Sequence, residues 1–300
     1  MSAVVPHRAE WRTLLMILVT YALWGLGTTL ITRWSPLAGV LLTGVAVAQF
    51  SSLQHEVLHG HPFRSRFWNE VLAFPALTLT VPYGRFRDTH LAHHHDPILT
   101  DPYDDPESNY FDPAVWAGLP GWARSVLRMN NTLLGRIVLG PLVGNLLWLR
   151  TEARLLAVGA PGVRRDWALH LAGLGPVVAW LWWAEMEAWA YIAAAYIGQA
   201  LLKVRTFLEH RAHEAARART VIIEDRGPLA LLFLNNNLHV VHHMHPNVPW
   251  YELPALYRRN PEHYRRRNEG YVYRSYAEIF RRYLLQAKDP VPHPLWPFRQ

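Results

Sequence analysis

Cysteine is absent from this 300-residue sequence. Its absence excludes disulfide bonds, zinc sites held by thiolates and an iron–sulfur cluster bound by the chain itself. If the protein needs electrons, we expect them from a separate carrier protein. Nucleic-acid-binding patterns are also lacking, so the net charge of +7 does not indicate a nucleic-acid partner.

Apolar residues, in contrast, make up 51% of the chain, and 14 residues are Trp. Long apolar runs predict an all-α integral membrane protein, because about 20 apolar residues in a helix cross the hydrocarbon core. We expect a single domain over residues 1–300 with four transmembrane helices, at about 11–31, 37–53, 168–184 and 188–202. The apolar segment 133–149 contains glycines, Pro141 and Arg136, which favour a helix that lies in the membrane interface or re-enters it.

The positive charges are distributed unevenly over this four-span arrangement. Every Lys and Arg except Arg33 falls on the side that carries the N-terminus, the segment 55–168 and the chain from Lys203 onward. The positive-inside rule therefore predicts that both termini are cytoplasmic and that a helical cap stands on the cytoplasmic side. The basic, tyrosine-rich stretch 258–282 is expected to lie on anionic lipids, although it would also suit an acidic electron carrier.

Histidines are concentrated in three clusters, all in the predicted cytoplasmic cap or at a helix end next to it. The second and third clusters have histidines at i, i+3 and i+4, which lie on one face of a helix. A ninth histidine follows the fourth predicted span. These residues are His55, His59, His90, His93, His94, His210, His239, His242 and His243. Nine imidazoles exceed the needs of one metal ion and suit two ions with open positions.

The three clusters resemble the histidine boxes of the membrane fatty-acid desaturase and hydroxylase superfamily, which includes carotenoid ketolases and alkane hydroxylases. The boxes appear in order, as HxxxH, HxxHH and HxxHH, and the resemblance covers about residues 37–256. It implies a non-haem di-iron centre that uses O2 as co-substrate. In acyl-CoA desaturases an extra histidine after the fourth span is also a ligand, and His210 matches it.

The resemblance further implies a lipid acyl chain as substrate and a separate electron donor of the ferredoxin, rubredoxin or cytochrome type. The sequence leaves open whether the product is a double bond or an alcohol. Four polar residues near the boxes are expected to support the ligands without binding the metals: Glu56, Asp101, Asn236 and His245. Asp101 is chosen from the acidic loop 96–107 because similar proteins often carry an acidic stretch after the second box.

Three alternatives stay open. The proline-bearing run 246–250 is similar to that of carotenoid ketolases, so a carotenoid or hydrocarbon substrate is possible. The first box also reads HExxH, the zinc metalloprotease motif, in which Glu56 would be the general base; this reading leaves the other two boxes without a role. A membrane metal-binding or transport protein is the third alternative, but transport would need polar ligands at mid-membrane.

Overall fold

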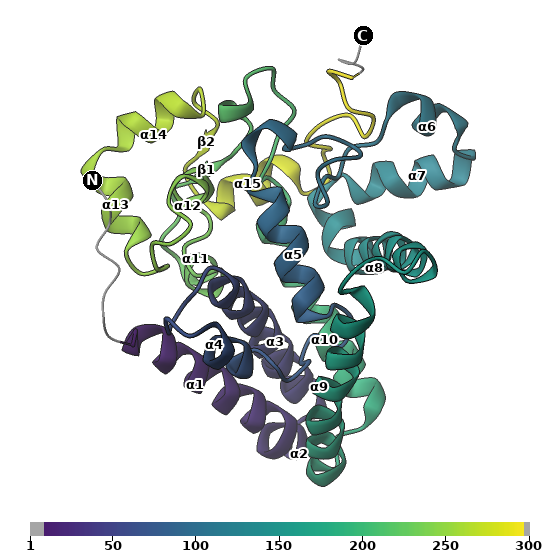
Figure 1. The fold of residues 1–300 in the computed structure, drawn as a ribbon, viewed down its shortest axis with the longest axis vertical. Coiled ribbons are helices and arrows are strands. Elements are labelled where there is room, and N and C mark those ends of the chain that lie inside the picture. Colours follow the sequence, from purple (N-terminus) through teal and green to yellow (C-terminus); the bar gives the residue numbers. More distant parts are fainter. Residues whose placement is uncertain (1–8, 297–300) are drawn as a thin grey trace. The chain divides into compact units, whose positions relative to one another are not determined.

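The computed structural model describes residues 9–296. The terminal residues 1–8 and 297–300, which the sequence assigns to the cytoplasm, lie outside the described residues. Helices dominate, and the strands are two residues long, so the predicted all-α class is confirmed (Figure 1).

The chain divides into two compact units, and each is assembled from separate stretches of sequence. The first comprises residues up to Arg87, Leu142–Leu202 and Asn247–Pro249, and the second comprises Asp88–Pro141, Lys203–Pro246 and residues from Trp250 onward. Because neither unit is one continuous piece of sequence, this division does not separate an N-terminal from a C-terminal domain. The single domain over 1–300 stays a prediction.

The first unit contains the long apolar helices. Its elements are α1 (Trp11–Leu26), a π-helical turn (Gly27–Ile31), α2 (Thr32–Trp34), α3 (Pro36–Leu58), α4 (Arg66–Leu72), α9 (Val163–Ala184), and parts of α5 (Tyr83–His93), α8 (Leu133–Ala157) and α10 (Ala188–Thr206). Ser35 caps α3, since its side chain accepts a hydrogen bond from the Ala38 N–H, and Pro36 occupies the first helical position.

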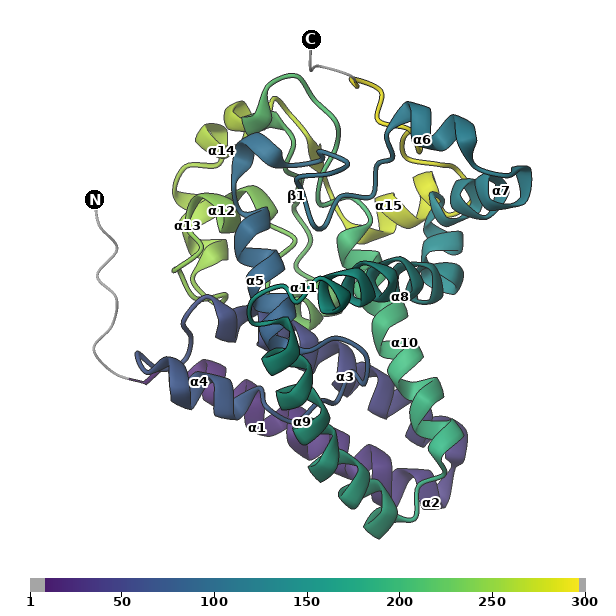
Figure 2. The same cartoon turned by 45° about the vertical axis from the view of Figure 1, so that its right-hand side comes forward.

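Helices α1 and α3 pack side by side (Figures 1 and 2). Small residues bring α3 close to α10: a Cβ at Gly198 would lie 2.7 Å from a methyl of Val47, and one at Gly44 equally near Ile197. The core of the unit also contains a polar pair, in which the Trp24 indole donates to the Tyr191 hydroxyl over 3.1 Å. The Tyr191 hydroxyl in turn donates to the Leu77 carbonyl over 3.0 Å, so this buried pair is satisfied inside the unit.

Four helices within residues 9–296 are long and apolar enough to span a membrane: Trp11–Trp34, Pro36–Leu58, Leu133–Ala157 and Val163–Ala184. Their outer faces are apolar; Trp182, for example, is 85% exposed. Three of these helices contain predicted spans. The fourth is α8, which the sequence assigns to the interface, whereas α10 carries Lys203 and Arg205 in its last turn and is not among the four. The span at 188–202 stays a prediction.

The second unit is built of short helices. Besides the remaining parts of α5, α8 and α10, it contains 3-10 turns at Asp96–Ile98 and Ala216–Ala218, α6 (Pro113–Gly118), α7 (Gly121–Asn130), β1 (Ile222–Ile223), α11 (Pro228–Leu232), α12 (His239–Met244), α13 (Leu253–Arg259), α14 (Pro261–Arg267), β2 (Val272–Tyr273) and α15 (Tyr276–Tyr283). Strands β1 and β2 pair in parallel, with Ile222 opposite Val272.

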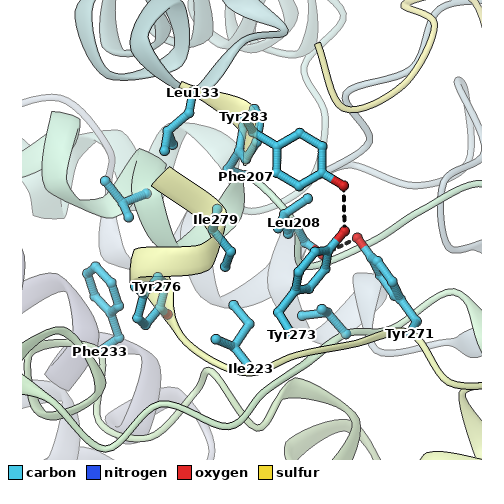
Figure 3. Packing of buried hydrophobic residues seen from close by; sticks show 12 residues of the cluster. Leu133, Phe207, Leu208, Ile223, Phe233, Tyr271, Tyr273, Tyr276, Ile279 and Tyr283 are labelled. Carbon is cyan, nitrogen blue, oxygen red and sulfur yellow. Dashed lines mark hydrogen bonds between the residues drawn. The ribbon is translucent and has the colours of Figure 1, made fainter. Parts of the chain in front are cut away.

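The core of the second unit is aromatic (Figure 3). Tyr276, Phe207 and Phe233 are almost completely buried. Three of the four phenol groups find partners: Tyr273 and Tyr283 share a hydrogen bond of 2.7 Å, and Tyr271 donates to the Leu208 carbonyl over 2.7 Å. Phe207 and Leu208 directly precede Glu209 and His210, so this core holds the backbone from which His210 projects.

Candidate metal centre

The second histidine box lies at the C-terminal end of α5. His90 and His93 are in its last turn and buried, and His94 follows directly, with its N–H donating to the His90 carbonyl over 3.2 Å. The i, i+3, i+4 spacing therefore acts as the sequence predicts, since one helical turn brings the three rings to the same end of the helix.

The third box forms the short helix α12, which starts at His239. A tight turn leads into it, with Leu234 and Asn235 in the left-handed region at φ 51° and 56°. Asn adopts this conformation more readily than most residues, which gives one reason for the asparagine run before the box. His239 and His242 are buried, and His243 is half-buried.

His210 comes from neither box. It lies just beyond α10, in an extended segment that pairs with Thr220. Two further backbone hydrogen bonds join this region to the third box: the Val221 N–H donates to the Glu209 carbonyl, and the Val240 N–H donates to the Val221 carbonyl, each over 3.1 Å. The extended segment therefore carries His210 to α12.

Seven imidazoles of the second unit fall into two groups. His93, His210, His239 and His243 form one group, and His90, His94 and His242 belong to the other; within a group, each residue offers a nitrogen within 4.8 Å of the others. Histidines at i and i+4 stay together, whereas His93 and His242, at i+3, join the group of the other box. Sequence neighbours such as His93 and His94 therefore belong to different groups.

The ring nitrogens of each group face one another. Nε2 of His210 lies 2.8 Å from Nε2 of His93 and 3.1 Å from Nε2 of His239. In the other group, Nε2 of His94 lies 3.0 Å from Nε2 of His90 and 3.2 Å from Nε2 of His242. The Nε2 atoms of these rings thus converge on two small volumes, one in each group.

The second nitrogen of three of these rings contacts an oxygen. Nδ1 of His93 lies 2.7 Å from Asp105 Oδ1, Nδ1 of His90 lies 3.0 Å from Glu107 Oε1, and Nδ1 of His239 lies 3.0 Å from Asn236 Oδ1. Carboxylate and amide oxygens only accept, so Nδ1 must donate. In the neutral ring, Nε2 then carries a lone pair aimed at the other imidazoles, which is the arrangement of metal-binding histidines.

The electrostatics keep most of these rings neutral. Burial lowers the pKa of His210, His239 and His243 well below the ordinary value, and burial together with the charges of His90 and His93 lowers the pKa of His94 to about 3. Neutral imidazole is the form that binds metals.

His93 is the exception. Burial disfavours its charged form, but Glu107 and Asp105 outweigh burial and raise the pKa of His93 to about 9. A metal at Nε2 would have to displace this proton. The same interaction acts on the partner: burial opposes ionisation of Glu107, but His90 and His93 lower its pKa far below the usual range.

The carboxylates of the acidic loop divide into two roles. Asp105 accepts at both oxygens, from His93 and from the Thr100 N–H, and Glu107 contacts His90. Asp101, the residue selected from the sequence, accepts the backbone N–H groups of Tyr103 and Asp104 and so stabilises the turn. Sequence reasoning placed the acids in the correct loop without distinguishing the residues that reach the histidines.

A buried acid–base pair behind the third box is not evident in the sequence. Glu209 lies 3.1 Å from Arg205 and accepts from the Asn236 amide over 3.3 Å, while the Asn236 oxygen faces His239. Burial raises the pKa of Glu209 in spite of Arg205. Two sequence signals accompany Glu209: its position directly before His210 and its i, i+4 spacing from Arg205.

Of the four remaining predicted residues, three belong to the first unit and one to the second. His55 and Glu56 are buried near the C-terminal end of α3 in the first unit, and His59 caps that helix, with the rings of His55 and His59 5.0 Å apart. His245, in the second unit, shares a hydrogen bond of 3.2 Å with the Tyr264 hydroxyl. Ligation by His55 and His59 stays a prediction.

Comparison with known protein families gives a match over most of the chain. The sequence profile of the Fatty acid desaturase family matches residues 32–275, which include all nine histidines. The chain belongs to the fatty acid desaturase family. The predicted resemblance is confirmed, and membership identifies the protein as a membrane oxidoreductase of the fatty acid desaturase or hydroxylase type. Among curated proteins, no match to this desaturase-family chain is found.

Proposed function

We propose that this protein is a di-iron oxidoreductase that desaturates or hydroxylates a lipid acyl chain. O2 is the co-substrate, and a separate carrier of the ferredoxin, rubredoxin or cytochrome type supplies the electrons. The observation that carries the proposal is the convergence of seven imidazoles in two groups, with three of the rings held by oxygens at Nδ1.

The donor set fits two metal ions. Lone pairs on adjacent Nε2 atoms repel one another unless a proton or a cation lies between them, and His210 Nε2 can share only one proton with two neighbours. A cation in each group would satisfy all the nitrogens at once. Imidazole nitrogen suits iron, zinc and copper, and the family favours iron.

When bound, two irons supply the redox chemistry that activates O2 toward an unreactive C–H bond. The chain's own residues would bind these ions and orient the imidazole rings. His90, His94 and His242 would bind one ion, and His93, His210, His239 and His243 the other, with His55 and His59 as further proposed ligands. Asp105, Glu107 and Asn236 keep Nδ1 protonated, which fixes the ring orientations. Burial of the rings excludes water.

A carotenoid or hydrocarbon remains the alternative substrate. The zinc-protease alternative is less well supported, because a single zinc held by the first box would leave the seven converging imidazoles of the second unit without a role. A membrane metal-binding protein would use the same groups of imidazoles as the proposed enzyme. The two differ in that only the enzyme forms an oxidised lipid product.

The proposal is tested by quantifying metals in the purified protein and lipids in an expressing host. We expect about two irons per chain, as two groups of imidazoles require, and new double bonds or hydroxyl groups in the host's acyl chains. His242→Ala should abolish the product and lower the iron content. His263→Ala, at an exposed position, is the control and should retain both. One zinc and no iron would refute the proposal.

A further inference from the structure

A pocket of about 390 Å³ opens in the second unit beside the third histidine box. It is lined by the chain before α11, by α13, by the start of α14 and by the residue after β2. In both views α13 and α14 lie close to α12 (Figures 1 and 2). Its volume is in the range of about 300–1,000 Å³ that small ligands use.

The two acidic residues of the pocket are already engaged. The Glu224 carboxylate accepts from the Tyr257 hydroxyl and from Arg265, whose Nη2 is 2.6 Å away. Asp225 accepts the N–H of Gly227 at one oxygen and the N–H of Tyr276 at the other. Both bonds of Glu224 are made at Oε1, and both oxygens of Asp225 are engaged, so contacts within the fold already hold these carboxylates.

Positively charged side chains outnumber the acidic ones around the pocket. Arg226, Arg258 and Arg274 line the same pocket, and within residues 9–296 their guanidinium groups make no hydrogen bond or ion pair. With Arg265, four guanidinium groups surround the pocket against two carboxylates. Glu224 offsets part of the charge of Arg226 and Arg265, but four like charges around one concavity still raise the local potential, which a bound anion would relieve.

We propose that this pocket binds a phosphate group. The guanidinium fork donates two parallel hydrogen bonds to phosphate oxygens, and several arginines around one concavity can hold a doubly charged group from different sides. An acidic protein surface would favour a flat basic patch over a concave pocket. The phosphate belongs either to the headgroup of an anionic lipid or to a soluble phosphorylated compound.

The ligand would lie next to the third box without contacting its histidines. Asn235 and Leu238 line the pocket, and Leu238 is the residue that precedes His239 at the start of α12. The site is distinct from the proposed metal ligands, so binding is measured without turnover. Failure to detect phosphate binding would therefore leave the proposed oxidation of an acyl chain unaffected.

The full chain is placed in nanodiscs of phosphatidylcholine, and inorganic pyrophosphate is titrated by calorimetry. In a second arm, phosphatidic acid is added to the nanodiscs, and the lipid retained by the protein is counted by native mass spectrometry. Saturable binding of pyrophosphate alone identifies a soluble ligand, and retention of phosphatidic acid identifies a lipid headgroup. Either result supports the proposal, provided that substitution of the pocket arginines weakens the binding.

Arg258→Gln and Arg274→Gln should each weaken binding about tenfold, the effect of losing one charge-assisted hydrogen bond. Arg259→Gln is the matched control: Arg259 is exposed, adjoins Arg258 on α13 and does not line the pocket. Binding in neither arm would overturn the proposal. Equal losses for Arg258→Gln and Arg259→Gln would also overturn it, because they would indicate general surface charge, as an acidic protein partner would use.

Discussion

At the scale of the residue, Asp105 shows how a single carboxylate can orient a candidate metal ligand. Its Oδ1 contacts His93 Nδ1 and accepts the Glu107 N–H, and its Oδ2 accepts the Thr100 N–H. Both oxygens therefore face donors. No isosteric side chain can replace Asp105 without directing an N–H group at another N–H group.

Asp105→Asn tests this arrangement, because the amide nitrogen must face one of these donors. We expect metal affinity to fall by about 10–100-fold, as for other residues that orient metal ligands. Asp101→Asn is the comparison, since Asn keeps the oxygen that the turn at Tyr103 uses. Iron per chain after dialysis against a graded chelator measures both. Equal retention by the two variants would contradict the assigned role of Asp105.

His210 offers a second test at this scale, because it is the histidine outside the boxes that shares a group with His93 and His239. His210→Ala should lower the iron content to about one per chain, since one of the two groups then loses a ligand. His213→Ala, three residues further on and part of neither group, should retain about two. Unchanged iron in His210→Ala would exclude His210 as a ligand.

At the scale of the element, the start of α8 depends on a close backbone approach. A Cβ at Gly135 would lie 1.8 Å from the carbonyl oxygen of Met129. The same oxygen accepts hydrogen bonds from the N–H and the hydroxyl of Thr132, so it cannot move without breaking the turn that leads into the helix.

Gly135→Ala should therefore destabilise the protein by about 1–3 kcal/mol, the usual cost of overpacking. Gly121→Ala serves as the control, because Gly121 begins α7 with nothing within 4 Å of the added methyl. Alanine is the better helix former, so this variant should be at least as stable as the parent. Thermal unfolding in detergent compares the two variants with the parent. Equal unfolding midpoints for Gly135→Ala and the parent would show that the turn adapts to the added methyl.

At the scale of the whole molecule, the distribution of charge predicts the arrangement in the membrane. Every Lys and Arg except Arg33 falls on one side if 188–202 spans and α8 lies in the interface. If α8 crosses instead, as its length and composition permit, its two ends lie on opposite sides. The two arrangements therefore differ in where the ends of α8 are accessible.

The absence of cysteine makes this testable, because a single introduced thiol has no competitor. Ser125→Cys and Val158→Cys place exposed thiols near the two ends of α8, and Glu187→Cys places one in the turn before α10. We expect an impermeant maleimide to label the first two from the cytoplasmic side and the third from the other. Labelling of Ser125→Cys and Val158→Cys from opposite sides would show that α8 spans.

The sequence alone determined the class of the protein and the residues of the boxes. The reason is that both signals are local: the length of an apolar run decides whether a helix can span, and the i, i+3, i+4 spacing brings imidazoles to one helix end without any tertiary contact. His210 was predicted from its position after the fourth span and from the resemblance. The acidic loop was recognised by its composition.

Only the tertiary structure decided how these residues combine. It separates His93 from His94 and joins His93 to His210, and it selects Asp105 where the sequence favoured Asp101. Adjacent helical residues point about 100° apart, and the partner that each ring meets comes from a segment distant in the sequence. Such pairings depend on packing between segments, as does the arginine-lined pocket, whose walls are contributed from Glu224 to Arg274.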